Sequence, residues 1–285
     1  MTAPGTSKHI LVTGGSSGIG RETALGLAKL GAAVTIVGRD PGRTREAVAW
    51  IKTGSGNQAV DSLRGDFSTL AEVRRVAAEY RATHSRLDVL VNNAGAGFGT
   101  YGETADGYEQ NWAVNHLSYF LLTHELLDLL RAAPSARIVN VASDLHTCGR
   151  IDFPADEARH YGPVKSYSRS KLANVLFSHA LARRLKGAGI TVNCLHPGAV
   201  KTDIAHDMRG PLKAINWALQ VIFSIPPEKG ALTSIHLASS PEVAGITGRY
   251  FKKCRAAKSS ALSRDEALQE SVWKLSAAQC GLPLE

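Results

Sequence analysis

Short apolar runs alternate with longer amphipathic segments along the first half of the chain. The runs are rich in β-branched and aliphatic residues and predict buried strands at residues 9–12, 33–37, 59–65 and 87–91. Between and after them, apolar residues recur at helical spacing, which predicts helices over residues 21–30, 69–82 and 105–131. Strands that alternate with helices are typical of a parallel sheet covered by helices.

The same alternation continues in the second half. It predicts strands at residues 138–141, 190–195 and 248–251 and a long helix over residues 166–186. Ser263 and Glu266 have the spacing of a capping box, which predicts that the last helix opens there. We find no linker or repeat in the 285 residues, and 44% of them are hydrophobic. We therefore expect one α/β domain over residues 1–285, with a Rossmann-type doubly wound parallel sheet in three layers.

A glycine-rich turn follows the first predicted strand. Its residues that could contact a nucleotide are Gly14, Ser16, Ser17, Gly18, Ile19 and Gly20. Glycines let the backbone approach a pyrophosphate, and the free N–H groups at the start of a helix favour an anion. The spacing G-x-x-x-G-x-G differs from the common G-x-G-x-x-G fingerprint. On its own, it is equally consistent with a tight strand-to-helix turn.

The second predicted strand ends at Gly38 and Arg39, where NAD-binding folds usually present an acid to the ribose hydroxyls. A guanidinium can pair with a 2′-phosphate, so Arg39 favours NADP(H) over NAD(H). Asp40, Arg43 and Arg45 lie nearby and complicate this reading. The alternative is that Arg39 is an ordinary surface arginine.

Ser143, Tyr167 and Lys171 carry the candidate chemistry. Tyr167 and Lys171 are four residues apart in a predicted helix, so both project from one face. A free tyrosine has a pKa of about 10. An ammonium about 4 Å away at an effective dielectric of about 20 contributes roughly 4 kcal/mol, so Lys171 could lower the pKa of Tyr167 by roughly three units. Tyr167 could then exchange a proton with a substrate hydroxyl, while Ser143, at the end of a strand, could bind the carbonyl oxygen.

The order of these motifs resembles the short-chain dehydrogenase/reductase family over almost the whole chain. The resemblance implies that Asn115, Ser143, Tyr167 and Lys171 form a catalytic tetrad in which Asn115 supports a proton path to the lysine. It also implies that Asp66 lies near the adenine. The further cofactor contacts that it implies are Phe67, Asn93, Ala94, Gly95, Tyr167, Lys171, Pro197, Gly198, Val200 and Thr202.

Within the family, the chain is most similar to the retinol dehydrogenase and WW-domain-containing oxidoreductase-like group. The stretches Val114-Asn-His-Leu117, Ser170-Lys-Leu-Ala-Asn174 and Cys280-Gly-Leu-Pro283 carry this likeness. Two departures are Ala142, where a second serine is common, and Asp144 directly after Ser143. The resemblance implies a homodimer or homotetramer joined through the long helices over residues 105–131 and 166–186.

Charge and cysteine content indicate no further partner or cofactor. The net charge is +8, and Lys252, Lys253, Arg255 and Lys258 form a local basic cluster, but no nucleic-acid motif accompanies them, so we expect no nucleic-acid partner. The four cysteines and ten histidines have no metal-ligand spacing, so we expect reduced thiols and no metal. With no long apolar stretch or signal peptide, we expect a cytoplasmic protein without a transmembrane anchor.

Substrate choice is expected to depend on two segments, residues 144–165 and the apolar segment 203–227. The latter could be a lid beside the nicotinamide, a helix packed on the core or on a subunit neighbour, or a membrane-surface segment. We expect an NADP(H)-preferring oxidoreductase that interconverts a lipophilic alcohol and its aldehyde or ketone. The alternatives are a ketoreductase for carrier-bound acyl or polyketide chains and a non-catalytic nucleotide sensor of the same fold.

Overall fold

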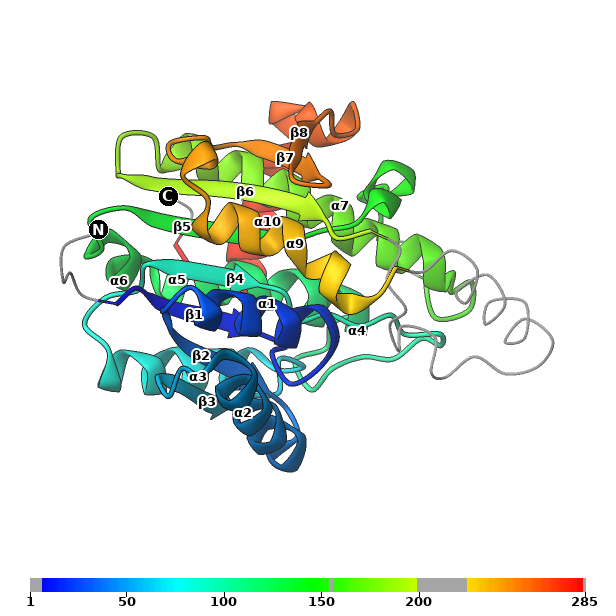
Figure 1. The fold of residues 1–285 in the computed structure, drawn as a ribbon. Coiled ribbons are helices and arrows are strands. Elements are labelled where there is room, and N and C mark those ends of the chain that lie inside the picture. Colours follow the sequence, from blue (N-terminus) through cyan, green and yellow to red (C-terminus); the bar gives the residue numbers. More distant parts are fainter. Residues whose placement is uncertain (1–6, 154–155, 199–224, 284–285) are drawn as a thin grey trace.

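The computed structural model describes residues 7–153, 156–198 and 225–283 (Figure 1). In these residues eight strands form one sheet of order β3-β2-β1-β4-β5-β6-β7-β8. They are β1 (His9–Thr13), β2 (Ala33–Gly38), β3 (Val60–Arg64), β4 (Val89–Asn92), β5 (Ala136–Val141), β6 (Ile190–His196), β7 (Arg249–Lys252) and β8 (Arg255–Ala257). The predicted Rossmann-type α/β fold is confirmed.

The sheet is parallel except at one edge. All pairs from β3 to β7 are parallel, whereas β8 pairs antiparallel with β7. Lys253 and Cys254 connect these two strands with φ angles of 47° and 60°, the backbone of a tight hairpin turn. The sheet is therefore mostly parallel, and its antiparallel edge strand β8 was not predicted.

The longer helices are α1 (Gly18–Lys29), α2 (Pro41–Ser55), α3 (Leu70–Thr83), α5 (Ser118–Glu125), α7 (Pro163–Arg184), α9 (Pro227–Ser239) and α10 (Glu266–Gln279). The shorter helices are α4 (Gln110–Trp112), α6 (Leu127–Arg131), the π-helix η1 (Ala113–Leu117) and the 3₁₀-helices η2 (Asp144–Cys148), η3 (Pro241–Val243) and η4 (Leu262–Arg264). None of the helices in the described part of the chain is long and apolar enough to cross a membrane.

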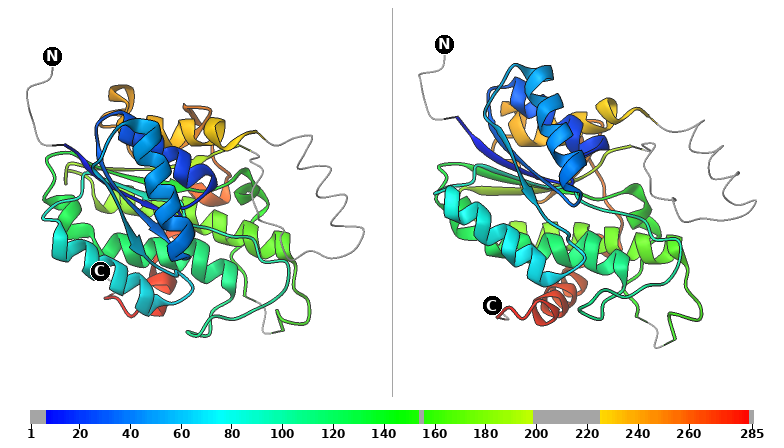
Figure 2. Two further views of the ribbon diagram at one scale, coloured as in Figure 1. Left: turned by 60° about the horizontal axis from the view of Figure 1, so that its bottom comes forward. Right: turned by 90° about the horizontal axis from the view of Figure 1, so that it is seen from below.

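The sheet forms the middle of three layers. Helices α1, α2 and α9 lie on one face, and α3, α5, α7 and α10 lie on the other (Figure 2). Each layer buries its own apolar cluster against the sheet, with Leu27 and Ile51 on the first side and Val76, Phe120 and Leu176 on the second. Because both faces are covered, the central strands are buried almost throughout.

The helix predicted over residues 105–131 differs most from the structure. Gly107 has a φ of 79° in a turn, and the chain becomes helical only after Glu109, whose carboxylate accepts the backbone N–H groups of Asn111 and Trp112. It then continues as α4, η1 and α5, and it breaks at Leu126 before α6. The predicted single helix is therefore four short ones.

The start of the last helix also differs. Asp265 caps α10, because its carboxylate accepts the N–H groups of Ala267 and Leu268 at 2.9 and 3.1 Å. Ser263 lies one turn earlier, in η4. The predicted capping box is wrong, since an aspartate directly before the helix binds the same kind of N–H group.

The carboxyl ends of β1 and β4 meet at the centre of the sheet, where the strand order reverses direction. Crevices at such reversals bind ligands in open α/β sheets. Most of the predicted site residues lie on the segments that leave this edge. The predicted lid at residues 203–227 lies outside the described residues except for its last three positions.

Candidate active site

The glycine turn after β1 has the backbone that only glycine tolerates without strain. Gly14 and Gly18 have φ angles of 66° and 53°. A Cβ atom at Gly14 would lie 2.8 Å from the Cα of Ala94, and one at Gly20 would lie 2.2 Å from the Gly14 carbonyl oxygen. The turn runs into α1 through Ser16 and Ser17, and no side chain in the described part of the protein caps that helix at Ser17. The first N–H groups of α1 are thus placed to bind an anion.

Thr13 fastens this turn to the segment after β4. Its buried hydroxyl accepts the backbone N–H groups of Asn93 and Ala94 at 2.8 and 2.9 Å. In return, the Asn93 side chain donates to the Thr13 carbonyl at 2.8 Å. Asn93 and Ala94 were predicted to contact the cofactor, whereas Thr13 was not predicted as a site residue. Its position directly before the glycines is the signal that could have found it.

The end of β2 places Arg39 and Asp40 in different roles. Asp40 caps α2, and its carboxylate accepts the backbone N–H of Arg43 at 2.8 Å. Gly38 is buried, and a Cβ atom there would lie 2.2 Å from the Thr44 hydroxyl oxygen. Arg39 is exposed beside the cap. Asp40 therefore caps the helix, and Arg39 is exposed at the same strand end.

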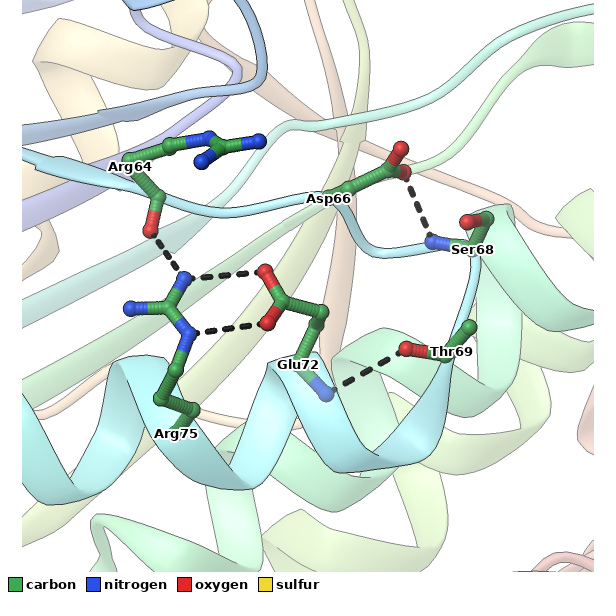
Figure 3. A pocket seen from close by; sticks show the side chains of 6 residues that line it. All are labelled: Arg64, Asp66, Ser68, Thr69, Glu72 and Arg75. Carbon is green, nitrogen blue, oxygen red and sulfur yellow. Dashed lines mark hydrogen bonds and ion pairs between the residues drawn. The ribbon is translucent and has the colours of Figure 1, made fainter.

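A pocket lies at the end of β3, next to the end of β2 (Figure 3). Asp66, which the family resemblance places near the adenine, lines it and accepts the Ser68 N–H at 3.1 Å. Phe67 is buried beside it. Figure 3 shows Arg75 forming two bonds with Glu72, at 2.8 and 2.9 Å, and these bonds hold the pKa of that carboxyl at about 2.

The rest of this pocket lining was not predicted from the sequence. It consists of Arg64, Ser68, Thr69, Glu72 and Arg75. The spacing of residues within α3 does not indicate this pocket. Arg75 lines it because its guanidinium extends from α3 to β3, where it donates to the Arg64 carbonyl at 2.7 Å.

Lys171 lies at the centre of the catalytic candidates. It is buried in α7, and its Nζ donates to the Val141 carbonyl at the end of β5 at 3.2 Å. The same Nζ is 5.5 Å from the ring centroid of Tyr167. A Cβ atom at Gly95 would lie 3.3 Å from it, so the segment after β4 approaches closely. The structure therefore brings Gly95, Tyr167 and Lys171 together.

Ser143 follows β5 and caps η2, where its hydroxyl accepts the backbone N–H of Leu145 at 3.2 Å. Interaction with the Ser143 side chain lowers the pKa of Tyr167, but burial has the larger effect and raises that pKa to about 12. Burial lowers the pKa of Lys171 to about 8. We expected Lys171 to bring the pKa of Tyr167 toward neutrality. In the structure, desolvation outweighs any such effect, and Tyr167 is protonated at neutral pH.

Asn115 lies in the π-helix η1 beside these residues. Its side chain binds the backbone of Ala96 and donates to the Ser170 hydroxyl at 3.1 Å. The backbone carbonyl of Asn115 accepts a hydrogen bond from the Asn174 side chain at 2.9 Å. Single π turns inside helices are frequent at functional sites.

Pro197 and Gly198 follow β6 and end this part of the described chain. Gly198 has a φ of 99°, and a Cβ atom there would lie 2.5 Å from Cδ1 of Ile225. Ile225 belongs to the last residues of the predicted lid segment, so that end packs against Gly198. Val200 and Thr202, also predicted to contact the cofactor, lie outside the described residues.

Comparison with known proteins agrees with this geometry. A family model described as short chain dehydrogenase matches residues 8–212. Retinol dehydrogenase 14 of Mus musculus is 40% identical, covering 96% of this chain and 86% of that protein. Retinol dehydrogenase 11 of Homo sapiens is 39% identical, and the match covers 98% of this chain and 87% of that protein.

Solved structures are similar too. An uncharacterized protein from Mycobacterium paratuberculosis superposes with a TM-score of 0.77 at 29% identity, covering 98% of this chain and 95% of that one. The RhlG/NADP complex from Pseudomonas aeruginosa has a TM-score of 0.69 at 28% identity, covering 92% and 96%. Actinorhodin polyketide ketoreductase with NADPH has a TM-score of 0.65 at 27% identity, covering 86% and 95%.

Proposed function

Because this chain belongs to the short-chain dehydrogenase/reductase family and is an oxidoreductase that acts on CH–OH groups with a nicotinamide cofactor, we propose that it prefers NADP(H). We further propose that it interconverts a lipophilic alcohol and its aldehyde or ketone. The observation that carries the proposal is the convergence of Ser143, Tyr167 and Lys171 beside Gly95. It provides a proton donor, a hydrogen-bond donor and a cation at the edge of the sheet where the glycine turn lies.

The residues at the glycine turn fit a dinucleotide. Close approach of Gly14 to Ala94 and of Gly20 to Gly14 leaves no space for side chains there, and the first turn of α1 presents N–H groups to a pyrophosphate. At the end of β2, Arg39 would bind the 2′-phosphate, because a guanidinium forms a two-pronged, charge-assisted pair with a phosphate. The capping role of Asp40 supports this assignment, since its carboxylate is held at the helix and away from the ribose.

The cofactor, when bound, supplies or accepts the hydride. In reduction, the Ser143 hydroxyl donates a hydrogen bond to the substrate carbonyl oxygen and stabilises the negative charge that develops there. Tyr167, protonated at neutral pH, gives its proton to that oxygen. Lys171 would bind the ribose hydroxyls, and its charge would favour the tyrosinate that remains. The tyrosinate would then regain a proton from solvent along a path through Lys171. Asn115 would support that path by holding the segment after β4 in place beside the lysine.

An apolar substrate is supported by two observations. The segment 203–227 is rich in apolar residues, and its end at Ile225 packs on Gly198 next to the predicted nicotinamide-side turn. Two proteins similar to the whole chain are named retinol dehydrogenases, which fits an alcohol with a large apolar body. The second candidate is a carrier-bound ketone, favoured by the similarity to a polyketide ketoreductase.

The experiment measures binding of NADPH and NADH by titration calorimetry and then turnover on lipophilic aldehydes, ketones and alcohols in the same preparation. We expect tighter NADPH binding and turnover of free substrates. Turnover only of a carrier-bound β-ketoacyl chain would replace the proposal with the second candidate. Nucleotide binding without turnover of any substrate would contradict an enzymatic role and support a sensor.

A further inference from the structure

Several polar groups converge on Asp144, the residue that follows Ser143. Its Oδ1 lies 2.6 Å from Nζ of Lys252 and accepts the Tyr250 hydroxyl at 2.8 Å. Its Oδ2 lies 3.5 Å from Nε2 of His196, and its backbone N–H donates to Nδ1 of the same ring at 3.2 Å. Both the side chain and the backbone of Asp144 are therefore held in place.

These partners come from the ends of two neighbouring strands. His196 is the last residue of β6, immediately before Pro197, and Lys252 is the last residue of β7. In the sheet, β5 pairs with β6 and β6 pairs with β7, with His196 opposite Lys252. Asp144 thus joins the segment that carries Ser143 to the segment that carries Pro197 and Gly198.

The position of the Ser143 hydroxyl depends on the same short turn. The hydroxyl accepts the Leu145 N–H, and the Ser143 carbonyl accepts from the backbone N–H of His146 at 3.1 Å. At its other end, the turn is held by His146, whose Nε2 accepts the Ser260 N–H at 3.1 Å. Asp144 is the only residue of this turn, in the described part of the protein, that forms an ion pair.

The carboxylate stays charged in this environment. Burial alone would raise the pKa of Asp144, but the hydrogen bonds from Lys252 and Tyr250 and the charge of Lys252 outweigh it and hold that pKa below its ordinary value. An anionic acceptor forms stronger hydrogen bonds than a neutral one. The link between the strand ends therefore persists across the neutral range.

We propose that Asp144 is a positioning residue that holds the Ser143 hydroxyl against Tyr167 and in register with the segment at Pro197. The inference rests on the proposed function, in which Ser143 and Tyr167 act on the substrate oxygen. Asp144 itself acts through Ser143. Its place directly after a catalytic serine, where the chain departs from its family pattern, gives the enzyme a third strand, β7, as an anchor for the site.

The test compares Asp144→Ala with Asp144→Asn in alcohol oxidation, measuring kcat, KM, the dissociation constant of NADP⁺ and the pH profile of kcat. We expect Asp144→Ala to lower kcat roughly tenfold or more, since small displacements of positioned groups have effects of this size. NADP⁺ binding should stay unchanged. Asp144→Asn should recover most of kcat, because its amide oxygen can still accept from Lys252 and Tyr250.

The pH profile separates positioning from simple charge. The Ser143 side chain lowers the pKa of Tyr167, so a displaced Ser143 should raise the kinetic pKa in Asp144→Ala, and Ser143→Ala should raise it too. Loss of a nearby negative charge alone would instead lower the kinetic pKa in both Asp144 variants. A lowered or unmoved kinetic pKa in Asp144→Ala, or unchanged kcat, would overturn the inference.

Two further variants complete the design. Asp128→Ala breaks a comparable exposed ion pair to Arg81, at 2.6 Å on α6, and should leave kcat and the pH profile unchanged. Tyr250→Phe removes one hydrogen-bond donor to Asp144 without changing charge, and it should raise the kinetic pKa less than Asp144→Ala does. It replaces Asp144→Ala as the test if that variant does not fold. Full turnover by Ser143→Ala would contradict the proposed function itself. An impaired Ser143→Ala with a normal Asp144→Ala would contradict only the role of Asp144.

Discussion

Asn115 binds both polar backbone groups of Ala96 through one side chain. Its Oδ1 accepts the Ala96 N–H at 2.8 Å, and its Nδ2 donates to the Ala96 carbonyl at 2.9 Å. Ala96 directly follows Gly95, which approaches Lys171. The asparagine therefore fixes the segment after β4 to the π-helix η1, at the point where that segment approaches the lysine.

This pairing predicts that Asn115→Ala lowers both stability and turnover. Loss of the amide leaves the partly buried backbone groups of Ala96 without their partner, and we expect the free energy of unfolding to fall by about 3 kcal/mol. Asn57→Ala is the matched control, because Asn57 also binds backbone groups, at Ala28, Ala32 and Ala59, but far from the site. Urea unfolding should show both variants destabilised, while only Asn115→Ala loses kcat. Equal kcat in the two would contradict a role for Asn115 in the site.

Tyr167→Phe should bind the nucleotide normally and lose most turnover. The substitution removes the hydroxyl that gives the proton, and general acid catalysis contributes roughly 10²- to 10⁴-fold to a rate. Tyr108→Phe is the control, since its hydroxyl donates to the Gln279 carbonyl away from the site. Calorimetry and steady-state kinetics measure the two effects. Substantial residual turnover in Tyr167→Phe would assign the proton transfer to another group.

Arg39→Ala should weaken NADPH binding and leave NADH binding unchanged. A hydrogen-bonded pair with a charged group contributes about 1.5–3 kcal/mol, which corresponds to roughly a 10- to 100-fold change in the dissociation constant. Arg45→Ala removes an equal charge from the exposed face of neighbouring α2. If both variants weaken NADPH binding equally, the effect comes from general positive potential, and Arg39 has no specific contact with the 2′-phosphate.

Thr13→Val tests the link between the glycine turn and the segment after β4. The isosteric change leaves the partly buried N–H groups of Asn93 and Ala94 without their acceptor, which should lower the free energy of unfolding by about 2 kcal/mol and weaken nucleotide binding. Thr23 is equally buried, but its hydroxyl has no hydrogen-bond partner in the described residues. Thr23→Val should therefore leave stability unchanged or raise it. Equal destabilisation of the two variants in urea would contradict this account.

Alternating apolar runs were sufficient to predict the sheet, because central strands covered on both faces must be apolar. The breaks at Gly107 and Leu126 were not predicted, since the apolar pattern of residues 105–131 continues across them and the breaks arise from local caps and turns. Helix α2 was missed as well. Its cap, Asp40, was considered only for its effect on the interpretation of Arg39, although Asp-Pro before a helical segment is a start signal.

The proximity of the candidate catalytic residues was predictable for a different reason. Tyr167 and Lys171 share one helix, so their spacing fixes their geometry. The anchoring of Ser143 depends on Tyr250 and Lys252, more than 100 residues away in the chain, and no local pattern indicates such a contact. The pKa of Tyr167 was also misjudged, because burial depends on the packing of several elements, whereas the sequence argument considered a single charge pair.

The buried histidine His116 predicts that acid destabilises the protein. It lies between α7 and α10, with Nδ1 3.2 Å from the Asn174 Oδ1 and Nε2 2.8 Å from the Ser276 hydroxyl. Burial lowers its pKa to about 4 from an ordinary value of 6.5, although the bond with Asn174 opposes the shift. Between these values the unfolded chain binds more protons than the folded one. The contribution of neutral His116 to the free energy of unfolding is therefore fully present above about pH 6.5 and is lost as the pH falls toward 4.

His116→Gln should flatten this dependence. Each histidine that stays neutral when folded contributes at most about 1.4 kcal/mol per pH unit across its window. Burial also lowers the pKa of His179 to about 4, so part of the slope should remain in the variant. The control is His160→Gln, because His160 is 74% exposed. Urea unfolding at intervals from pH 4 to 8 measures the slope. An unchanged slope in His116→Gln would show that His116 is not a group whose protonation drives acid unfolding.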